Sequence, residues 1–298
     1  MKQIQKISTM LLQTVIVFTG CKKDNDLVSS SSSSMLYDDA AESISTAMGD
    51  ESGGALESFA DVLSVAGGGS LSTTLAKSSG DEMVAAGIPV YDSLNGWWTV
   101  SIDRSKYGIQ ASGFMKRVYQ YQFSKNSVFQ KLRINSADTA TTVKFKIIDG
   151  SGYFSNLRVK HYLTKLRGGW TVNDLNKDTV TLNSDTVYVR AGVDTIITRN
   201  MIRTFDHTLR ITKMTDVRGL RFRLNRDNFT IWRNNFSKAI SGTVEGTFYA
   251  SITFRKGDLY KERTISKTFT ITLGAGAGSL TINGGGKFGM DLHGGTRN

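Results

Sequence analysis

The stretch that decides the fold runs from Thr243 to Leu273 and contains two long segments with a short turn between them. The first segment, Thr243–Phe254, reads TVEGTFYASITF, and the second, Leu259–Leu273, reads LYKERTISKTFTITL. They are joined at Lys256-Gly257-Asp258, and a short glycine-containing connection of this kind favours a β-hairpin. The stretch therefore predicts the longest pair of antiparallel strands in the protein.

Upstream of this pair, from Tyr91 onward, apolar residues recur at every second position. Five runs show the pattern: Trp98–Ile102, Val118–Phe123, Val143–Ile147, Leu157–Leu163 and Phe205–Ile211. Alternation of apolar and polar side chains is typical of antiparallel strands that turn one face to the core and the other to water. Residues 91–298 are therefore predicted to form an all-β domain of roughly a dozen strands, either a hairpin-rich antiparallel sandwich or an open barrel.

Turn-forming residues are expected to separate these strands. They occur at Asp149-Gly150, Gly168-Gly169, Asn183-Ser184-Asp185 and Ala191-Gly192. Beyond the glycine-rich segment 274–278, two short strands are expected at Ser279–Ile282 and Lys287–Leu292. The segment Asn228–Lys238 is compatible with a helix or with a strand and a loop.

Residues 36–90 are rich in Ala, Ser, Gly and acidic residues and are predicted to form a neck that precedes the β domain. Apolar residues at helical spacing predict a helix over Gly54–Ala66, and Ala40–Met48 is a second candidate helix that Asp38 or Asp39 would cap. Small side chains bury little area, so both helices are expected to be marginally stable. The neck is therefore expected to be a weakly ordered segment packed on the β domain, with an acidic partner-binding segment as the alternative.

Charge divides the chain at a similar place. Residues 21–100 contain three Lys or Arg and twelve Asp or Glu, a net charge of −9, whereas residues 101–298 contain 32 basic and 14 acidic residues, a net charge of +18. A strongly basic domain attracts anionic partners such as polysaccharide, lipopolysaccharide phosphate or nucleic acid. The alternative is a solvated basic face without a specific partner.

The first twenty residues have the layout of a secretory signal. Two lysines form a cationic start, Leu11–Phe18 form an apolar core, and the small residues Thr19 and Gly20 precede Cys21. The apolar run is too short for a transmembrane helix, which needs about 20 mostly apolar residues. Cys21 is the only cysteine, so the chain has no pair of thiols for an internal disulfide.

Small residues followed by Cys21 resemble the lipobox of bacterial lipoproteins, although Phe18 stands where that motif usually has Leu. The residues that follow resemble the export signal of surface lipoproteins in the Bacteroidota; they are Lys22, Lys23, Asp24 and Asp26. The resemblance implies a signal peptide over residues 1–20, acylation of Cys21, and a lipid anchor in the outer membrane at the cell surface. The six serines Ser29–Ser34 would complete a flexible tether over residues 21–35.

Catalytic and metal-binding motifs are missing from the sequence. His161 and His207 fall on the apolar faces of their strands without a close-spaced third ligand, so they are expected to be core histidines bonded to backbone groups. The sequence contains no nucleophile motif, no phosphate-binding loop and no paired carboxylates on a predicted scaffold. Neither an enzymatic role nor a cofactor or metal is therefore expected.

Basic side chains are expected on the outer face of the β domain, with Tyr162 among them, and form a candidate face for an anionic ligand. Strand alternation assigns seven residues to this face: Lys144, Lys146, Arg158, Lys160, Arg210, Arg221 and Arg223. Trp97 is the candidate for stacking against a sugar ring, unless the acidic neck covers it. No nucleic-acid motif is found, and a surface location argues against that partner.

Five tripeptides, each an Asp followed by Ser or Thr and an aliphatic residue, resemble the O-glycosylation sequence of exported Bacteroidota proteins. The resemblance implies sugars on five residues: Ser93, Thr139, Thr179, Thr186 and Thr195. The alternative is structural, because Asp commonly ends a turn and a Thr with a β-branched neighbour begins a strand.

Together these features favour a lipid-anchored cell-envelope protein with a non-catalytic binding or structural role, directed at an anionic glycan. The alternative is a periplasm-facing carrier whose open β domain shelters a lipid or another apolar ligand. The rings of Tyr119, Tyr121 and Phe123 distinguish the two. A cavity lined by these rings would favour the carrier, whereas a filled core would favour the binding module.

Overall fold

The structure, a computed structural model, describes residues 31–49, 52–66, 82–107, 111–135, 138–156, 159–177, 179–198, 201–220, 241–274 and 276–297. Contacts divide the chain into two compact units, Met1–Met35 and Leu36–Asn298, and all the described strands lie in the second unit. The described helices are α2 (Ser31–Met48) and α3 (Ala55–Ala66). Neither is long and apolar enough to cross a membrane.

The described strands follow one another along the chain as mostly sequential hairpins. They are β1 (Glu82–Ala86), β2 (Val90–Asp92), β3 (Trp97–Lys106), β4 (Ala111–Lys125), β5 (Val128–Gln130), β6 (Ile134–Asn135), β7 (Asp138–Thr139), β8 (Thr142–Asn156), β9 (Val159–Asn173), β10 (Thr179–Thr198), β11 (Met201–Leu220), β12 (Ser241–Lys256), β13 (Leu259–Gly274), β14 (Ala277–Ile282), β15 (Gly286–Asp291) and β16 (Thr296–Arg297).

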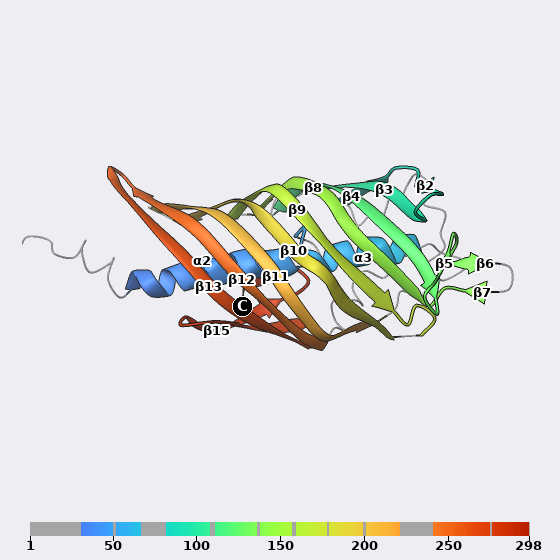
Figure 1. Cartoon of the computed structure of the whole chain (residues 1–298). Coiled ribbons are helices and arrows are strands. Elements are labelled where there is room, and N and C mark those ends of the chain that lie inside the picture. Colours follow the sequence, from blue (N-terminus) through green and yellow to red (C-terminus); the bar gives the residue numbers. More distant parts are fainter. Residues whose placement is uncertain are drawn as a thin grey trace, which may run out of the picture. The chain divides into compact units, whose positions relative to one another are not determined.

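Fourteen strands form one antiparallel sheet, in the order β1-β3-β4-β8-β9-β10-β11-β12-β13-β14-β15-β16, with β2 paired to β3 and β5 paired to β4. Strands β6 and β7 form a separate two-stranded sheet. The large sheet is unclosed, and within the second unit it curves around α3 and the part of α2 that follows Met35 (Figure 1). The predicted all-β, antiparallel, hairpin-rich architecture is confirmed.

From Asp39 onward α2 is buried within this sheet, and so are the residues of α3 whose side chains the structure describes. Apolar Ile44 and Phe59 are fully buried, and so are the polar residues Ser43, Thr46 and Asp61. A helix buried all round is usually apolar all round. Here α2 is instead built largely from Ala and Ser, whose small side chains fit the narrow interior, and from carboxylates that find partners on the sheet.

The segment predicted as a separate acidic neck is therefore part of the same compact unit as the sheet. Both candidate helices exist, but α2 begins at Ser31, inside the predicted tether of residues 21–35. Consequently Asp38 and Asp39 lie within the helix and do not cap it. The segment also supplies β1, which pairs with β3. Burial against the sheet provides the stabilisation that short helices of small residues lack on their own.

The predicted hairpin of Thr243–Phe254 and Leu259–Leu273 is confirmed. Strands β12 and β13 pair from Ser241–Gly274 to Lys256–Leu259, and Gly257 adopts a φ of 58° at the turn. The two predicted C-terminal strands appear as β14 and β15, which pair with each other. The segment Asn228–Lys238 lies outside the described residues.

The four predicted turns inside residues 149–192 are wrong, because long strands run through each of them. Asp149-Gly150 lies within β8, Gly168-Gly169 within β9, and the other two within β10. Register shifts occur at these places, between Ser184 and Thr186, Thr186 and Val189, and Ala191 and Gly192. Such β-bulges bend and twist a strand without ending it. The turn-like residues therefore mark the places where the sheet curves around the helices.

Gly192 on β10 occupies one of these irregular positions and leaves no room for a side chain. A Cβ atom there would lie 2.0 Å from the carbonyl oxygen of Tyr162 on β9. We expect Gly192→Ala to destabilise the protein by about 1–3 kcal/mol, the usual cost of overpacking a core. Urea unfolding checks this value, with Gly274→Ala as the control because a Cβ at Gly274 meets no atom within 4 Å. Equal stability of the two variants would contradict the expectation.

An aromatic cluster joins α3 to the inner face of β8, β9 and β10. The ring of Phe59 packs edge-on against Trp170 and Phe145, with centroid distances of 5.1 and 6.1 Å. Trp170 also contacts Tyr188 at 5.4 Å. A Cβ at Gly168 would lie 2.9 Å from the Trp170 ring, so this glycine makes space for it. The glycine pair that resembles a turn in the sequence thus accommodates the largest ring of the core.

Candidate functional site

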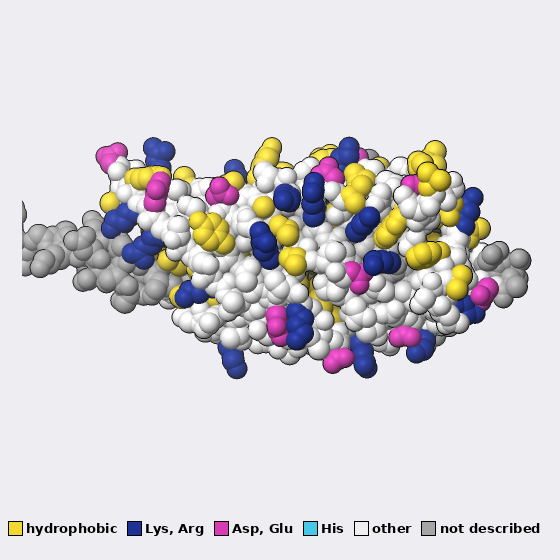
Figure 2. Space-filling model, viewed as in Figure 1, with side chains coloured by type: hydrophobic (Ala, Val, Ile, Leu, Met, Phe, Trp, Pro, Cys, Tyr) yellow, Lys and Arg dark blue, Asp and Glu magenta, His cyan; other side chains and the backbone are white. Residues whose placement is uncertain are grey.

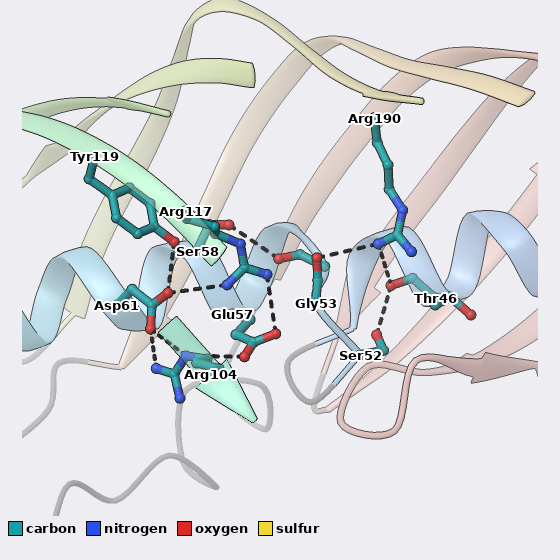
Figure 3. A network of polar contacts seen from close by, with 11 residues as sticks. Thr46, Ser52, Gly53, Glu57, Ser58, Asp61, Arg104, Arg117, Tyr119 and Arg190 are labelled. Atoms are coloured by element: carbon teal, nitrogen blue, oxygen red, sulfur yellow. Dashed lines mark hydrogen bonds and ion pairs between the residues drawn. The ribbon is translucent and has the colours of Figure 1, made fainter. Parts of the chain in front are cut away.

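A buried polar cluster links α3 to strands β3 and β4 (Figure 3). Arg104 donates from Nε to Asp61 Oδ1 at 2.9 Å and lies 3.1 Å from Glu57. Arg117 donates to Asp61 Oδ2 at 3.2 Å and to Glu57 Oε2 at 3.3 Å. The hydroxyl of Tyr119 donates to Asp61 at 2.7 Å, and burial raises the pKa of Tyr119 well above its ordinary value, so it keeps this proton. Asp61 therefore accepts bonds from three side chains while completely buried.

A second set of cations holds α2. Arg203 on β11 donates to Asp39 Oδ1 at 3.1 Å, and Arg297 in β16 pairs with Asp38. Arg190 on β10 donates from one terminal nitrogen to the carbonyl oxygens of Thr46 and Gly53, at 3.3 Å each (Figure 3). A cation at the C-terminal end of a helix is favourable because carbonyl groups there carry partial negative charge. Sheet cations thus hold the middle of α2 and its C-terminal end.

These contacts assign a structural role to the acidic residues of the helices. The carboxylates of Asp39, Glu57 and Asp61 neutralise arginines on the inner face of the sheet and are buried there, so these three are not available to an outside partner. They also do not cover Trp97, because the helices pack on the inner face whereas Trp97 belongs to the outer face. Because these carboxylates balance the charge of arginines on the inner face, the excess positive charge of the β domain lies mainly on its outer face.

His161 and His207 are buried, as predicted, and share a partner that the sequence did not indicate. His161 Nδ1 lies 2.8 Å and His207 Nδ1 3.8 Å from Asp194 Oδ1, and Ser43 Oγ on α2 donates to Asp194 Oδ2 at 2.6 Å. His207 Nδ1 is also 3.4 Å from the carbonyl oxygen of Phe205.

The cluster contains Ser, His and Asp but does not form a catalytic arrangement. A catalytic serine must be activated by a neighbouring base, but Ser43 donates to the carboxylate of Asp194 and not to a histidine. A catalytic serine must also reach its substrate, whereas Ser43, Asp194 and both histidines are buried. Within the described residues, no group of three or more His, Cys, Asp or Glu could hold a metal ion. The arrangement ties α2 to β9, β10 and β11.

The same cluster makes stability depend on pH. Burial lowers the pKa of His207. The charge of Asp194 acts in the opposite direction and raises this pKa, whereas Arg190 and His161 lower it further. In the unfolded chain His207 titrates near pH 6.5, so from about that pH downward protons bind preferentially to the unfolded state and the fold loses stability. We expect His207→Gln to reduce the loss of stability between about pH 7 and pH 5. Urea midpoints of both proteins at the two pH values measure this, and an unchanged difference would contradict the expectation.

The predicted basic face is outward as expected, but its described members form two separate groups. Lys144 and Lys146 lie near one end of β8, where Lys144 is paired in register with Thr171 of β9. Lys160 lies eleven residues along β9 from Thr171, a distance on the order of 35 Å in an extended strand. Arg158, Arg221 and Arg223 lie outside the described residues.

The first group is already engaged by its neighbours. Lys146 Nζ lies 4.3 Å from the centroid of the Trp97 ring, so a lysine occupies one face of the candidate stacking residue. Trp97 itself is half-buried. Lys144 Nζ is 3.7 Å from Asp185, which also accepts a bond from Thr171 at 2.6 Å. Both lysines of the first group therefore already have partners within the protein.

The second group is larger than predicted, and we call it the outer basic patch. It comprises Lys160, Lys165 and Arg167 on β9 and Arg210 on β11, all exposed. Arg167 and Arg210 are both paired in register with Val189, so they lie two strands apart, about 10 Å. Figure 2 shows Lys and Arg side chains gathered over the middle of this sheet face, with hydrophobic side chains between them.

The charge of the outer basic patch is not balanced locally. None of its four cations has an ion-pair partner among the described residues, whereas Arg104, Arg117 and Arg203 on the inner face are all paired. Asp206 is an exposed carboxylate of β11 on the same face. Half-buried Val189 and Ala191 on β10 lie between the cations of β9 and β11, so the centre of the patch carries short apolar side chains.

Sequence alternation missed Lys165 and Arg167 because β9 is irregular between them and Lys160. Thr164 and Lys165 are both exposed in succession, next to the register shift between Ala191 and Gly192. A bulge moves the following residues to the opposite face from the one that strict alternation predicts. Two neighbouring polar residues in an otherwise alternating strand are the signal that would have revealed it.

The candidate glycosylation residues lie in different settings. Ser93, Thr179 and Thr186 are exposed, and Thr139 and Thr195 are half-buried. The aspartates before four of them have structural bonds: Asp92 with the backbone N–H of Leu94, Asp138 with Lys125, Asp185 with Thr171, and Asp194 with Ser43. These bonds give the aspartates a reason to be present that is independent of glycosylation.

A small cavity of about 30 Å³ lies between α3 and the strands β3, β4 and β8. Gly53, Glu57, Arg104 and Met115 are among the residues that line it. Ligand pockets commonly measure about 300–1,000 Å³, so this cavity is large enough only for water.

The residues of the predicted lipidation and export signals lie outside the described part of the chain. They are Cys21, Lys22, Lys23, Asp24 and Asp26, together with the signal peptide over residues 1–20. A scan against protein-family models and searches of curated proteins and of solved structures found no match to this chain.

Proposed function

We propose that this chain is a lipid-anchored outer-membrane protein, displayed at the cell surface, that binds anionic glycan through the outer basic patch and catalyses no reaction. The carrying observation is the contrast between the two faces of the sheet. Arg104, Arg117 and Arg203 on the inner face are paired with helix carboxylates, whereas the four outward cations of the patch have no ion-pair partner among the described residues. Unmatched charge on an exposed face attracts an anionic polymer.

The membrane location in this proposal is supported by the N-terminal sequence. Cys21 follows an apolar core and small residues, as in lipoproteins, and Lys22 to Asp26 resemble the export signal of Bacteroidota surface lipoproteins. A protein held at the cell surface meets polysaccharide and lipopolysaccharide before it meets nucleic acid. Glycan is therefore the anionic polymer that fits both the positive charge of the outer basic patch and the proposed location at the cell surface.

The alternative function is a periplasm-facing carrier, which needs space inside the sheet. The three rings that distinguish the hypotheses are packed: Tyr119, Tyr121 and Phe123 are 1%, 5% and 5% exposed. Tyr119 bonds to Asp61, and the ring of Tyr121 contacts those of Trp98 and Phe123. Around these rings the interior is occupied by side chains of the protein itself, which favours the binding module.

Protease digestion of intact cells tests the location, with a Cys21→Ala variant beside the unaltered protein. The proposal predicts that the β domain is digested from outside and that the variant is no longer retained in the membrane. Protection until the outer membrane is opened would contradict surface display and would favour the carrier.

Glycan binding tests the role of the patch. The probe is polygalacturonate, with neutral dextran as its uncharged counterpart. Combined Lys165→Ala, Arg167→Ala and Arg210→Ala is expected to weaken polygalacturonate binding about tenfold or more at low salt, and added salt should weaken binding by the unaltered protein. The matched control removes three exposed charges elsewhere, Lys177→Ala, Arg255→Ala and Lys256→Ala. Equal losses in both triple variants would contradict a role for the patch.

A further inference from the structure

Three aromatic side chains form a row across the outer face of strands β4, β8 and β9. Phe114 pairs in register with Tyr153, and Tyr153 pairs with Tyr162. Paired residues of antiparallel strands point to the same face, about 5 Å from one strand to the next. Phe114 is 47% and Tyr162 61% exposed, and the rings of Tyr153 and Tyr162 are 6.0 Å apart. We call these three residues the aromatic row.

The aromatic row is a narrow apolar strip between polar rows. On one side lies the register row Ser112, Ser155 and Lys160, and on the other side Lys116 pairs with Ser151. Lys116 faces Asp103 on β3, whereas Lys160 has no ion-pair partner among the described residues. Lys160 also belongs to the outer basic patch, so the aromatic row and the patch are continuous along β9.

This arrangement discriminates between kinds of partner. A membrane or a protein interface would call for a broad apolar area. A strip one residue wide, edged by hydroxyl groups and a cation, instead matches a sugar ring, which has an apolar C–H face and a polar rim. Aromatic rings are suited to such contacts because they bury apolar area at little cost in side-chain freedom.

We propose that the aromatic row is a sugar-stacking subsite for the acidic hexopyranose units of the glycan. The sugar faces stack on Phe114, Tyr153 and Tyr162, and Lys160 pairs with a carboxylate of the bound units. This inference rests on the proposed function and goes further, because it assigns recognition to the sugar ring as well as to charge. The chain of the glycan then runs across the strands, from β4 toward the outer basic patch.

The test separates stacking from simple charge attraction by using two polyanions on the full chain. Polygalacturonate offers sugar faces and carboxylates, whereas inorganic polyphosphate offers charge alone. Combined Phe114→Ala and Tyr162→Ala is expected to weaken polygalacturonate binding about tenfold or more and to change polyphosphate binding less than about twofold. Tyr162→Phe keeps the ring and is expected to bind both probes like the unaltered protein. Tyr260→Ala, at a tyrosine 59% exposed and far along another hairpin, is the matched control.

The outcomes distinguish this inference from the function on which it rests. Unchanged polygalacturonate binding by the double alanine variant, or equal weakening toward both probes, overturns the sugar-stacking subsite while the proposed function stands. Failure of the unaltered protein to bind polygalacturonate overturns the proposed function itself. Thermal unfolding of each variant accompanies the binding measurement, and a selective loss in a variant that keeps its melting temperature supports the subsite.

Discussion

Asp61→Ala is expected to lower the free energy of unfolding by about 3–5 kcal/mol, the usual consequence of breaking a buried ion pair. Asp61 is completely buried and accepts bonds from Arg104, Arg117 and Tyr119. Its loss leaves the buried guanidinium of Arg117 with Glu57 as its carboxylate neighbour and removes the acceptor of the Tyr119 hydroxyl. The measurement is the shift in urea midpoint at an unchanged denaturant slope.

Two further variants make the Asp61 result interpretable. Asp174→Asn breaks the exposed pair between Asp174 and Lys177, whose side chains are 34% and 68% exposed. Asn also tolerates the φ of 66° at this position, so the change is expected to cost less than about 1 kcal/mol. Adding Arg117→Met to Asp61→Ala is expected to recover part of the loss, because it removes the unbalanced charge. A loss for Asp61→Ala as small as that for Asp174→Asn would mean that α3 is not held in the sheet as described.

Phe59→Ala is expected to cost about 3–5 kcal/mol, as large-to-small changes of buried aromatic residues usually do. The ring of Phe59 is fully buried and packs edge-on against Trp170 and Phe145 on the inner face of the sheet. Its removal leaves a cavity at the centre of the contact between α3 and strands β8 and β9. Urea unfolding measures the effect, and the near-ultraviolet circular dichroism of Trp170 should change with it.

The control for Phe59 is a phenylalanine outside the core. Phe129 on β5 is 66% exposed, and Phe129→Ala is expected to change stability by no more than about 0.5 kcal/mol. If Phe59→Ala also changed stability by no more than this, α3 would not be packed against the sheet as described.

The sheet could be predicted because its evidence is local. Alternation in runs such as Phe205–Ile211 and the turn at Gly257 needs only neighbouring residues, and the resulting strands are confirmed. The predicted turns failed because a glycine pair such as Gly168-Gly169 has the same appearance in a turn as in a strand that must accommodate a large ring. Here Gly168 leaves space for Trp170 and Tyr188, and Tyr188 belongs to a different strand, so the reason for the glycine is not visible in the local sequence.

The interior position of the helices could not be predicted from composition. Their small residues predict weak helices, and this is correct for the helices alone, but the sheet supplies the missing contacts. One signal was present in the sequence: Arg117 and Arg203 fall on the apolar faces of their strands, in phase with Tyr119 and Phe205. An arginine at an inward position requires buried hydrogen-bond acceptors, and for these two arginines the carboxylates of the helices supply them. Only the folded arrangement shows which acid meets which arginine.

The candidate site was predicted in part, for reasons of the same kind. Lys160 and Arg210 point outward as alternation requires, whereas Lys165 and Arg167 were missed because a bulge shifts β9 by one residue. Lys144 and Lys146 also point outward, but Asp185 and Trp97 engage them, which no pattern along one strand reveals. The aromatic row could not be predicted either, because it forms only when three strands pair in register, and no single strand shows it in its sequence.

Native-state hydrogen exchange tests most directly whether α2 and α3 belong to the folded core of the sheet. The amide hydrogens of Ile44 and Phe59 are predicted to exchange with the same free energy as those of buried strand residues such as Phe145 and Leu209, because helices and sheet open together. If the helix amides exchange at a much lower free energy than the strand amides, the helices leave the sheet under native conditions. The inward arginines would then be accessible, and the carrier hypothesis would replace the binding module.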